Sequence, residues 1–252
     1  MLSIYSWNIN GLRAVPDFLD WLQSLRPDVL CLQEVRADPN QLALEVRHPE
    51  GYHTAWATAG QPGYSGIAIY TRHKPLHVHI GMGKSRYDCE GRTLTLEFEQ
   101  FYLISAYVPS GAPGRSKWYY KMAYLHHLLE YIITLRAEGK AVVLCGDFNI
   151  AHTELDLVRP IRVAGFMAEE RDWISELLEN GFVDSFRALH PERSDAFTWW
   201  SYRLREQNRG WRMDYAFISS DLLPFLQEAS IHPDIAGSDH CPISLKLQLS
   251  LK

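Results

Sequence analysis

Cysteine is scarce and scattered in this sequence. The four cysteines lie far apart and form no Cys-x-x-Cys pair, so their spacing argues against a zinc site or a disulfide framework. Cys31 and Cys145 stand inside apolar runs, where reduced and buried thiols are common. We therefore expect free cysteines.

Long hydrophobic runs are also missing. No apolar stretch approaches the roughly 20 residues that a membrane span needs, and the first residues lack the basic and apolar segments of a secretory signal. No low-complexity segment or repeat of about 20–50 residues occurs, and the Pro/Gly clusters at 60–63 and 109–114 are too short to be interdomain linkers. We expect an intracellular protein without a membrane anchor, in which residues 1–252 form one domain that acts as a monomer.

Positive charge is not in excess. Lys and Arg total 25 against 30 Asp and Glu, a net charge of −5. This balance excludes nucleic-acid binding through bulk charge, so any DNA affinity must come from a local basic face. Carboxylates gathered around a metal ion would explain part of the acidic balance, because the ion reverses the local charge.

The residues that are present predict a globular α/β protein. Apolar residues make up 46% of the chain, enough for a substantial core. Short apolar runs predict buried strands at 2–7, 29–32, 67–70, 101–108 and 141–145. Alternating runs at 93–98 and 244–249 predict strands with one wetter face. Helices are predicted at 18–25, at 172–178 and along an apolar stripe at Met122, Leu125, Leu129, Ile132 and Leu135.

Polar side chains follow several of the predicted strands. Asn8 and Glu34 each come directly after an apolar run, Tyr107 lies at the end of a third, and Asp147 and Asn149 follow a fourth. In sheets that are covered on both faces, ligands bind beyond such strand ends. Carboxylates, amides, a phenol and an imidazole suit an oxygen-ligated hard cation such as magnesium or manganese.

Each of these residues alone has an ordinary explanation. Asn8 could cap a turn, and Glu34 could be a solvated strand end. Asp214 could simply pair with Arg212, and His240 could be a buried histidine with satisfied hydrogen bonds.

Their combination and order are more informative. The blocks are Trp7–Ala14, Leu32–Glu34, Ala106–Pro109, Gly146–Asn149, Gly210–Tyr215 and Gly237–Ile243. With these blocks the chain resembles the exonuclease III family of abasic-site endonucleases, within the wider endonuclease/exonuclease/phosphatase superfamily, over residues 4–248. The resemblance implies a four-layer α/β sandwich, with two mixed β-sheets packed face to face, helices on the outside and the active site at one edge of the sheets.

The resemblance also implies an activity and a set of site residues. It implies a hydrolase that cleaves double-stranded DNA 5′ to abasic sites, with 3′→5′ exonuclease and 3′-end-cleaning activity, and that uses one or two Mg²⁺ ions or, alternatively, Mn²⁺. The expected catalytic residues are Tyr107, Asp147, Asn149, Asp214 and His240. The expected metal ligands are Asn8, Glu34 and Asp239, with Asp147 and Asn149 at a possible second position.

Roles within this set follow from side-chain chemistry. We expect Asp214 to fix the imidazole tautomer of His240 and to favour its charged form. His240 could act as a base or as a phosphate contact, and we favour Asp147 as the base with His240 on the phosphate. Tyr107 could donate a hydrogen bond to a phosphate oxygen or, with a labile proton, assist the leaving group.

Aromatic residues interleaved with arginines occupy Thr198–Arg205 and Arg209–Met213, a pattern that suits a DNA backbone with a missing or flipped-out base. By the resemblance, Trp199, Trp211 and Met213 would wall a pocket for an abasic deoxyribose, whereas Trp200 is expected in the core. Candidates for phosphate contacts are Arg13, Arg86, Arg115, Lys117, Arg203 and Arg209, with Arg13 and Arg115 preferred as substrate-binding residues.

The sequence departs from relatives at three places. Asn10 replaces an aspartate found in some of them, Ser110 replaces a longer amide side chain, and the segment from Tyr202 to Trp211 is shorter. Glu154 and Asp156 are expected to cap or form salt bridges rather than to catalyse. Two alternatives remain, namely the same fold acting on RNA, lipid head groups or inositol phosphates, and a nucleic-acid binding module without catalysis.

Overall fold

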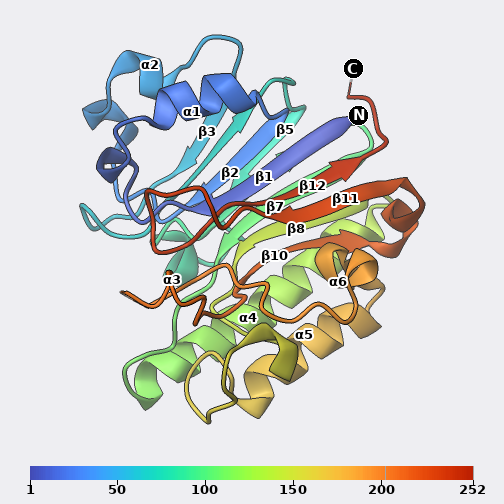
Figure 1. Ribbon diagram of the computed structural model, residues 1–252. Helices are drawn as coiled ribbons and strands as arrows, with labels where there is room; N and C mark the ends of the chain where they lie inside the picture. Colours follow the sequence, from blue (N-terminus) through green and yellow to red (C-terminus); the bar gives the residue numbers. More distant parts are fainter. Residues whose placement is uncertain (202, 252) are drawn as a thin grey trace.

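Two six-stranded sheets form the centre of the computed structural model, which describes residues 1–201 and 203–251 (Figure 1). The first sheet contains, in spatial order, β11 (Leu226–Ile231), β12 (Ile243–Leu247), β1 (Leu2–Asn8), β2 (Val29–Gln33), β4 (Ile67–Thr71) and β3 (His53–Ala57). The second contains β5 (His77–Ile80), β6 (Thr93–Glu97), β7 (Phe101–Tyr107), β8 (Ala141–Asp147), β10 (Asp214–Ser219) and β9 (Phe182–Asp184). Each sheet is mixed, because β1–β2 and β7–β8 are parallel and the other pairs are antiparallel.

Helices cover the outer faces of both sheets (Figure 1). The α-helices are α1 (Phe18–Leu25), α2 (Leu44–Arg47), α3 (Ser85–Asp88), α4 (Arg115–Ala137), α5 (Ala168–Glu179) and α6 (Ser185–Leu189). Short 3₁₀ turns are η1 (Leu12–Ala14), η2 (Pro39–Gln41), η3 (Glu154–Asp156) and η4 (Ser220–Phe225). Phe18 and Leu22 of α1 pack on the first sheet, and Leu125 and Ile132 of α4 pack on the second.

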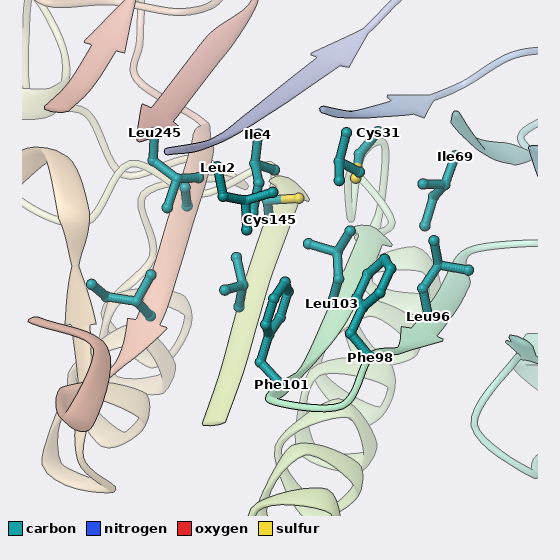
Figure 2. Close-up of a cluster of buried hydrophobic side chains, with 14 of the residues drawn as sticks. Leu2, Ile4, Cys31, Ile69, Leu96, Phe98, Phe101, Leu103, Cys145 and Leu245 are labelled. Atoms are coloured by element: carbon teal, nitrogen blue, oxygen red, sulfur yellow. The ribbon is translucent and has the colours of Figure 1, made fainter. Parts of the chain in front are cut away.

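The main core lies between the two sheets. Figure 2 shows Ile4 and Cys31 of the first sheet pointing toward Leu103 and Cys145 of the second. This core and the two helix-covered faces make four layers, so the predicted α/β sandwich is confirmed. All four cysteines are free, as expected. Within the described residues, no helix combines the length and apolar character that a membrane span requires.

The prediction of a wetter face on the strand at 93–98 is wrong. Thr93 and Thr95 of β6 are buried, because α4 covers this face and supplies tyrosine hydroxyls as partners. Thr93 Oγ1 lies 2.7 Å from the Tyr124 hydroxyl, and the Tyr131 hydroxyl donates to Thr95 Oγ1 at 3.0 Å. Threonine can therefore occupy a covered face when each hydroxyl has a hydrogen-bond partner.

The two parallel pairs bring their carboxyl ends to the same edge of the sandwich. Asn8 pairs in register with Gln33, and Tyr107 pairs with Asp147. Next to Asp147, Gly146 has a φ of 144°, and a Cβ there would lie 1.9 Å from the Ala106 carbonyl oxygen. Only glycine lets β7 and β8 approach this closely, so it sets the position from which Asp147 leaves the sheet.

Candidate active site

Asp147, at the end of β8, lies at the centre of the predicted cluster. Its side chain is buried, and its Oδ2 accepts hydrogen bonds from Asn8 Nδ2 at 2.9 Å and from Asn149 Nδ2 at 3.1 Å. Its Oδ1 accepts from the Asn149 backbone N–H at 2.8 Å. His240 Nε2 lies 3.8 Å from the Asp147 carboxylate. The Asp147 carboxylate thus contacts side chains from both sheets and from the loop that carries His240.

Glu34 joins this cluster from the turn after β2. Asn8 Nδ2 donates to Glu34 Oε2 at 3.1 Å as well as to Asp147, so one amide bridges two carboxylates. The other oxygen of Glu34 forms an ion pair with Arg36. Glu34 has a φ of 57°, a left-handed conformation that is uncommon for residues other than glycine and that clusters at functional sites.

His240 and Asp214 form a buried pair. His240 Nδ1 lies 2.8 Å from Asp214 Oδ2, so this nitrogen carries a hydrogen and Nε2 faces Asp147. Backbone contacts fix both partners, since the Asp214 N–H donates to Thr198 Oγ1 at 3.1 Å and the His240 N–H donates to Ser238 Oγ at 3.1 Å. The pairing that the sequence predicted between Asp214 and His240 is therefore present.

The surroundings raise the pKa of both titrating groups of the cluster. Burial raises the pKa of Asp147 to about 7, with Asp214 adding to the rise and His240 opposing it. Burial disfavours the charged imidazole of His240, but Asp214 and Asp147 outweigh it and raise the pKa to about 10. At neutral pH the imidazole is therefore cationic, and Asp147 is the group able to exchange a proton.

Asp239 lies at the exposed rim of the cluster. Asn10 Nδ2 donates to its Oδ1 at 2.8 Å, and Trp199 Nε1 donates to its Oδ2 at 3.0 Å. An aspartate at position 10 could not make the first of these bonds while ionised. The amide at this position thus contributes no charge and instead holds Asp239 in place.

Tyr107 ends β7 beside the cluster. The Arg92 guanidinium lies 4.6 Å from the centre of its ring. Burial, with the negative charges of Glu34 and Asp147, raises the pKa of Tyr107 above its ordinary value. The phenol therefore keeps its proton at neutral pH, which favours hydrogen-bond donation over the labile-proton alternative.

The three predicted pocket walls lie side by side. Trp199 and Trp211 exchange backbone hydrogen bonds of 2.9 Å in both directions, and the Trp199 ring centre lies 6.5 Å from that of His240. Met213 is largely buried. Trp211 packs edge-on against Phe166 at 6.4 Å, a wall residue that sequence reasoning missed because its segment carries no motif.

The predicted basic residues fall into different places. Arg86 and Lys117 line a cavity of about 400 Å³ that Tyr107 also borders. Arg115 lines a neighbouring hollow of about 580 Å³ at the start of α4. Arg13 and Arg115 are exposed, and among the described residues neither forms an ion pair. The structure therefore does not bring these two arginines into the carboxylate cluster.

The predicted aromatic and basic block at 198–205 is described except for Tyr202, which lies outside the described residues. Arg203 and Arg209 are exposed. Trp200 is 2% exposed, so its predicted core position is confirmed. Arg205 packs over Trp200 at 4.7 Å and donates to the Ser238 carbonyl at 2.8 Å, which gives it a structural place beneath the loop that carries Asp239.

The ordinary explanation for Asp214, an ion pair with Arg212, is wrong. Arg212 is fully buried and donates to Asp156 Oδ1 at 2.7 Å and to Asp184 Oδ2 at 2.8 Å. Asp156 also pairs with Arg187. The expected salt-bridging role of Asp156 is confirmed. Asp214 pairs with His240 instead of Arg212.

The sequence profile of the Endonuclease/Exonuclease/phosphatase family matches residues 5–240. The chain belongs to this family. It is 43% identical over 256 residues to the exodeoxyribonuclease of Bacillus subtilis (strain 168), with 98% of this chain and 100% of that protein aligned. It is 43% identical over 255 residues to the DNA repair nuclease APEX1 of Danio rerio, covering 98% of this chain and 82% of that protein. The solved structure of an AP endonuclease from Archaeoglobus fulgidus superposes with a TM-score of 0.89 at 28% identity, covering 99% of this chain and 100% of the other.

The Endonuclease/Exonuclease/phosphatase family is divalent-metal dependent, and the donor set of this chain fits such an ion. One potential ligand atom each from Asp147, Asp214 and His240 lies within 4.8 Å of the others, and because the charged imidazole cannot bind a cation, the two carboxylates are the donors of this group. Asp214 Oδ1 is buried and has no hydrogen-bond partner among the described residues. With the Glu34 carboxylate alongside, the donors are mainly oxygen, which suits a hard divalent cation.

Several residues that organise this family member's site went unnoticed in the sequence. Arg36 pairs with Glu34, and Arg92 stacks on Tyr107. Lys121 of α4 is fully buried beneath the Asn149 turn. A signal existed for Lys121, because it lies four residues before Leu125 and so falls on the apolar stripe of its helix.

Proposed function

We propose that this chain is a metal-dependent DNA-repair phosphodiesterase that cleaves duplex DNA on the 5′ side of abasic sites and also trims and cleans 3′ ends. It would work as a single domain, as a monomer, inside the cell. The relatives named above are an exodeoxyribonuclease and a DNA repair nuclease, aligned over nearly the whole chain. Hydrolysis of a DNA phosphodiester is thus the activity that family membership favours.

The observation that carries the proposal is the arrangement around Asp147. A buried carboxylate with a pKa of about 7 lies 3.8 Å from a cationic imidazole. The first group can take a proton from water, and the second can bind a phosphate oxygen. A base and a positive charge held together in a buried site can both assist attack on a phosphodiester.

Asp214 and Asn149 support these two roles. Asp214 holds the His240 ring by its Nδ1, so the charged Nε2–H faces Asp147 and would donate to a phosphate bound beside that carboxylate. Asn149 donates to Asp147 through both its side chain and its backbone, which fixes the direction of the carboxylate. Tyr107, protonated at neutral pH, would donate a hydrogen bond to another phosphate oxygen.

Glu34, Asn8 and Asp239 are proposed as the metal ligands, with Asp147 and Asn149 at a possible second position. A bound Mg²⁺, or Mn²⁺, would stabilise charge on the phosphate and on the departing oxygen. Asn8 holds Glu34 and Asp147 at one amide, and Asn10 together with Trp199 holds Asp239 at the rim.

The aromatic wall supports the abasic specificity. Trp199, Trp211 and Met213 adjoin the His240–Asp239 side of the cluster. An apolar wall beside the reacting phosphate would accept a sugar without its base, and a stacked nucleotide would fit there less well.

A nicking assay tests the proposal. The substrate is a duplex with one abasic analogue, run beside undamaged duplex, uracil-containing duplex and a duplex with a blocked 3′ end. We expect a nick 5′ to the abasic analogue, loss of that activity with excess chelator, and recovery when magnesium is restored. Full activity under chelation would refute the metal requirement, and no nick at the abasic analogue would refute the proposed substrate.

A further inference from the structure

A buried ion pair joins α4 to α5 behind the active site. Lys121 and Glu170 are both completely buried, and Lys121 Nζ lies 2.6 Å from Glu170 Oε1. Desolvating two charges is costly and is tolerated only when hydrogen bonds satisfy them. The other hydrogen-bond partners of Lys121 and Glu170 therefore show which backbone segments the two buried charges stabilise.

The lysine holds the turn that carries Asn149. Lys121 Nζ donates to the Asn149 carbonyl oxygen at 2.7 Å. Asn149 has a φ of 53°, and in this left-handed conformation its own N–H reaches back to Asp147 Oδ1 at 2.8 Å. A charged hydrogen bond from beneath thus stabilises an uncommon backbone conformation next to the central carboxylate.

The glutamate holds the segment behind the aromatic wall. Glu170 Oε2 accepts from the Gly165 N–H at 2.7 Å and from the Met167 N–H at 2.9 Å. Gly165 packs closely, because a Cβ there would lie 3.1 Å from the Asn149 carbonyl oxygen and 3.2 Å from the Trp211 ring. Gly165 therefore packs against both the Asn149 turn and Trp211 of the proposed pocket wall.

We infer that Lys121 and Glu170 are positioning residues that couple the Asn149 turn to the Gly165–Trp211 side of the substrate pocket. The pair touches neither substrate nor reacting atoms. Through one contact to a backbone carbonyl and two to backbone N–H groups, the pair would keep the base and the pocket wall at a fixed distance from each other, which the cleavage of an abasic site requires. This inference rests on the proposed function.

A purely structural pair would behave differently, and a double substitution separates the two possibilities. Replacing a buried ion pair by apolar residues is often neutral or stabilising, whereas removing one partner leaves an uncompensated charge. The variant Lys121→Met with Glu170→Met should therefore fold while lacking every contact described above. Glu170→Gln is the second variant, because a carboxamide cannot accept from Lys121, Gly165 and Met167 together.

The experiment measures kcat and KM for nicking of an abasic duplex, together with amide hydrogen exchange at Gly165 and Met167. For the double variant we expect kcat to fall about tenfold or more, KM to rise, and the two amides to lose protection. For Glu170→Gln, whose amide oxygen can still accept from both N–H groups but whose NH₂ cannot accept from Lys121, we expect the same fall in kcat with the amide protection largely kept. Lys121→Arg, which retains the charge, should keep most of kcat. The control is Leu177→Ala in α5, the helix of Glu170, which should lower the melting temperature but leave kcat within about twofold.

Wild-type kcat and amide protection in the double variant, or wild-type kcat in Glu170→Gln should the double variant not fold, would overturn the inference. An equal loss of kcat in Leu177→Ala would do the same, because the effect would then follow stability alone. If the wild-type protein itself does not nick abasic duplex, the proposed function fails. The amide exchange still decides in that case whether the pair holds the Gly165 segment.

Discussion

Asp147 and His240 lie 3.8 Å apart, and the pKa of each is raised above its ordinary value. Burial raises the pKa of the carboxyl to about 7, while two carboxylates raise the pKa of the imidazole to about 10. A carboxyl whose pKa is raised toward neutrality is a better proton acceptor than an ordinary carboxylate, and an imidazole that stays protonated keeps its positive charge beside it. We therefore assign the proton-accepting role to Asp147.

Asp147→Asn and His240→Asn should each lower the rate of cleavage at an abasic analogue by about 10³-fold or more. The first variant removes the base, and the second removes the cation beside the phosphate. Affinity for the duplex should stay within a few-fold, because most contacts to DNA come from other residues. Single-turnover nicking and a separate binding titration measure the two quantities.

His126→Asn is the matched control for the histidine, since His126 is exposed on α4 and, among the residues that the structure describes, pairs with Glu130 of the same helix alone. It should leave the rate unchanged. Near-wild-type cleavage by Asp147→Asn would remove that residue from the reaction centre.

At the scale of elements, a buried charge network ties the η3 turn to the neighbouring strands β9 and β10. Arg212, which precedes β10, holds Asp156 of η3 and Asp184 at the end of β9. These contacts fix the start of β10, where Asp214 lies next to Met213. The network thus supports the site from a distance without taking part in its chemistry.

Asp156→Asn should destabilise the fold by about 3 kcal/mol or more at neutral pH, because it leaves buried arginine charge uncompensated. Burial opposes ionisation of Asp156, but Arg212 and Arg187 outweigh it and lower the pKa. The stabilisation is therefore fully present above the unfolded-state pKa, near about 4, and is lost as the pH falls toward the depressed folded value.

Urea unfolding of both proteins between neutral and acidic pH measures this effect. The difference in free energy of unfolding should be largest at neutral pH and should shrink at pH values below about 4. Asp221→Asn, which removes a half-exposed partner of Arg136, is the control and should cost at most about 1 kcal/mol. A difference for Asp156→Asn that does not change with pH would contradict the assignment.

At the scale of the whole molecule, the net charge of −5 opposes DNA binding. The cavity beside Tyr107 is nevertheless lined by Arg86, Arg92 and Lys117. A basic surface next to the cluster can attract phosphate although the molecule as a whole is acidic, because salt screens charges farther than about 10 Å.

Lys117→Ala should weaken binding to all duplex sequences and reduce the slope of log affinity against log salt by about 1. The measurement is duplex binding across about 50–200 mM salt. Lys246→Ala is the control, because Lys246 lies on β12 and pairs with Glu228. Equal slopes for the wild-type protein and Lys117→Ala would show that Lys117 does not contact a DNA phosphate.

The sequence by itself determined the strands with continuous apolar runs, the α4 stripe and the ordered polar blocks. It did so because side-chain periodicity and strand-end position are local properties of the chain. Asn8, Glu34 and Asp147 could therefore be named before their distances were known. Strands such as β3 and β10 lack a comparably clear local pattern, and their pairing came only from the fold.

Only the tertiary structure decided which polar groups became partners. Thr93 can be buried because a helix distant in sequence supplies a tyrosine hydroxyl as its partner. Arg212 pairs with Asp156 and Asp184, although Asp214 is nearer to it in sequence. The Lys121–Glu170 pair likewise exists because two helices meet behind the site. Hydrogen bonds and ion pairs act over a few ångströms, so their partners depend on how the chain packs and cannot be deduced from residue order.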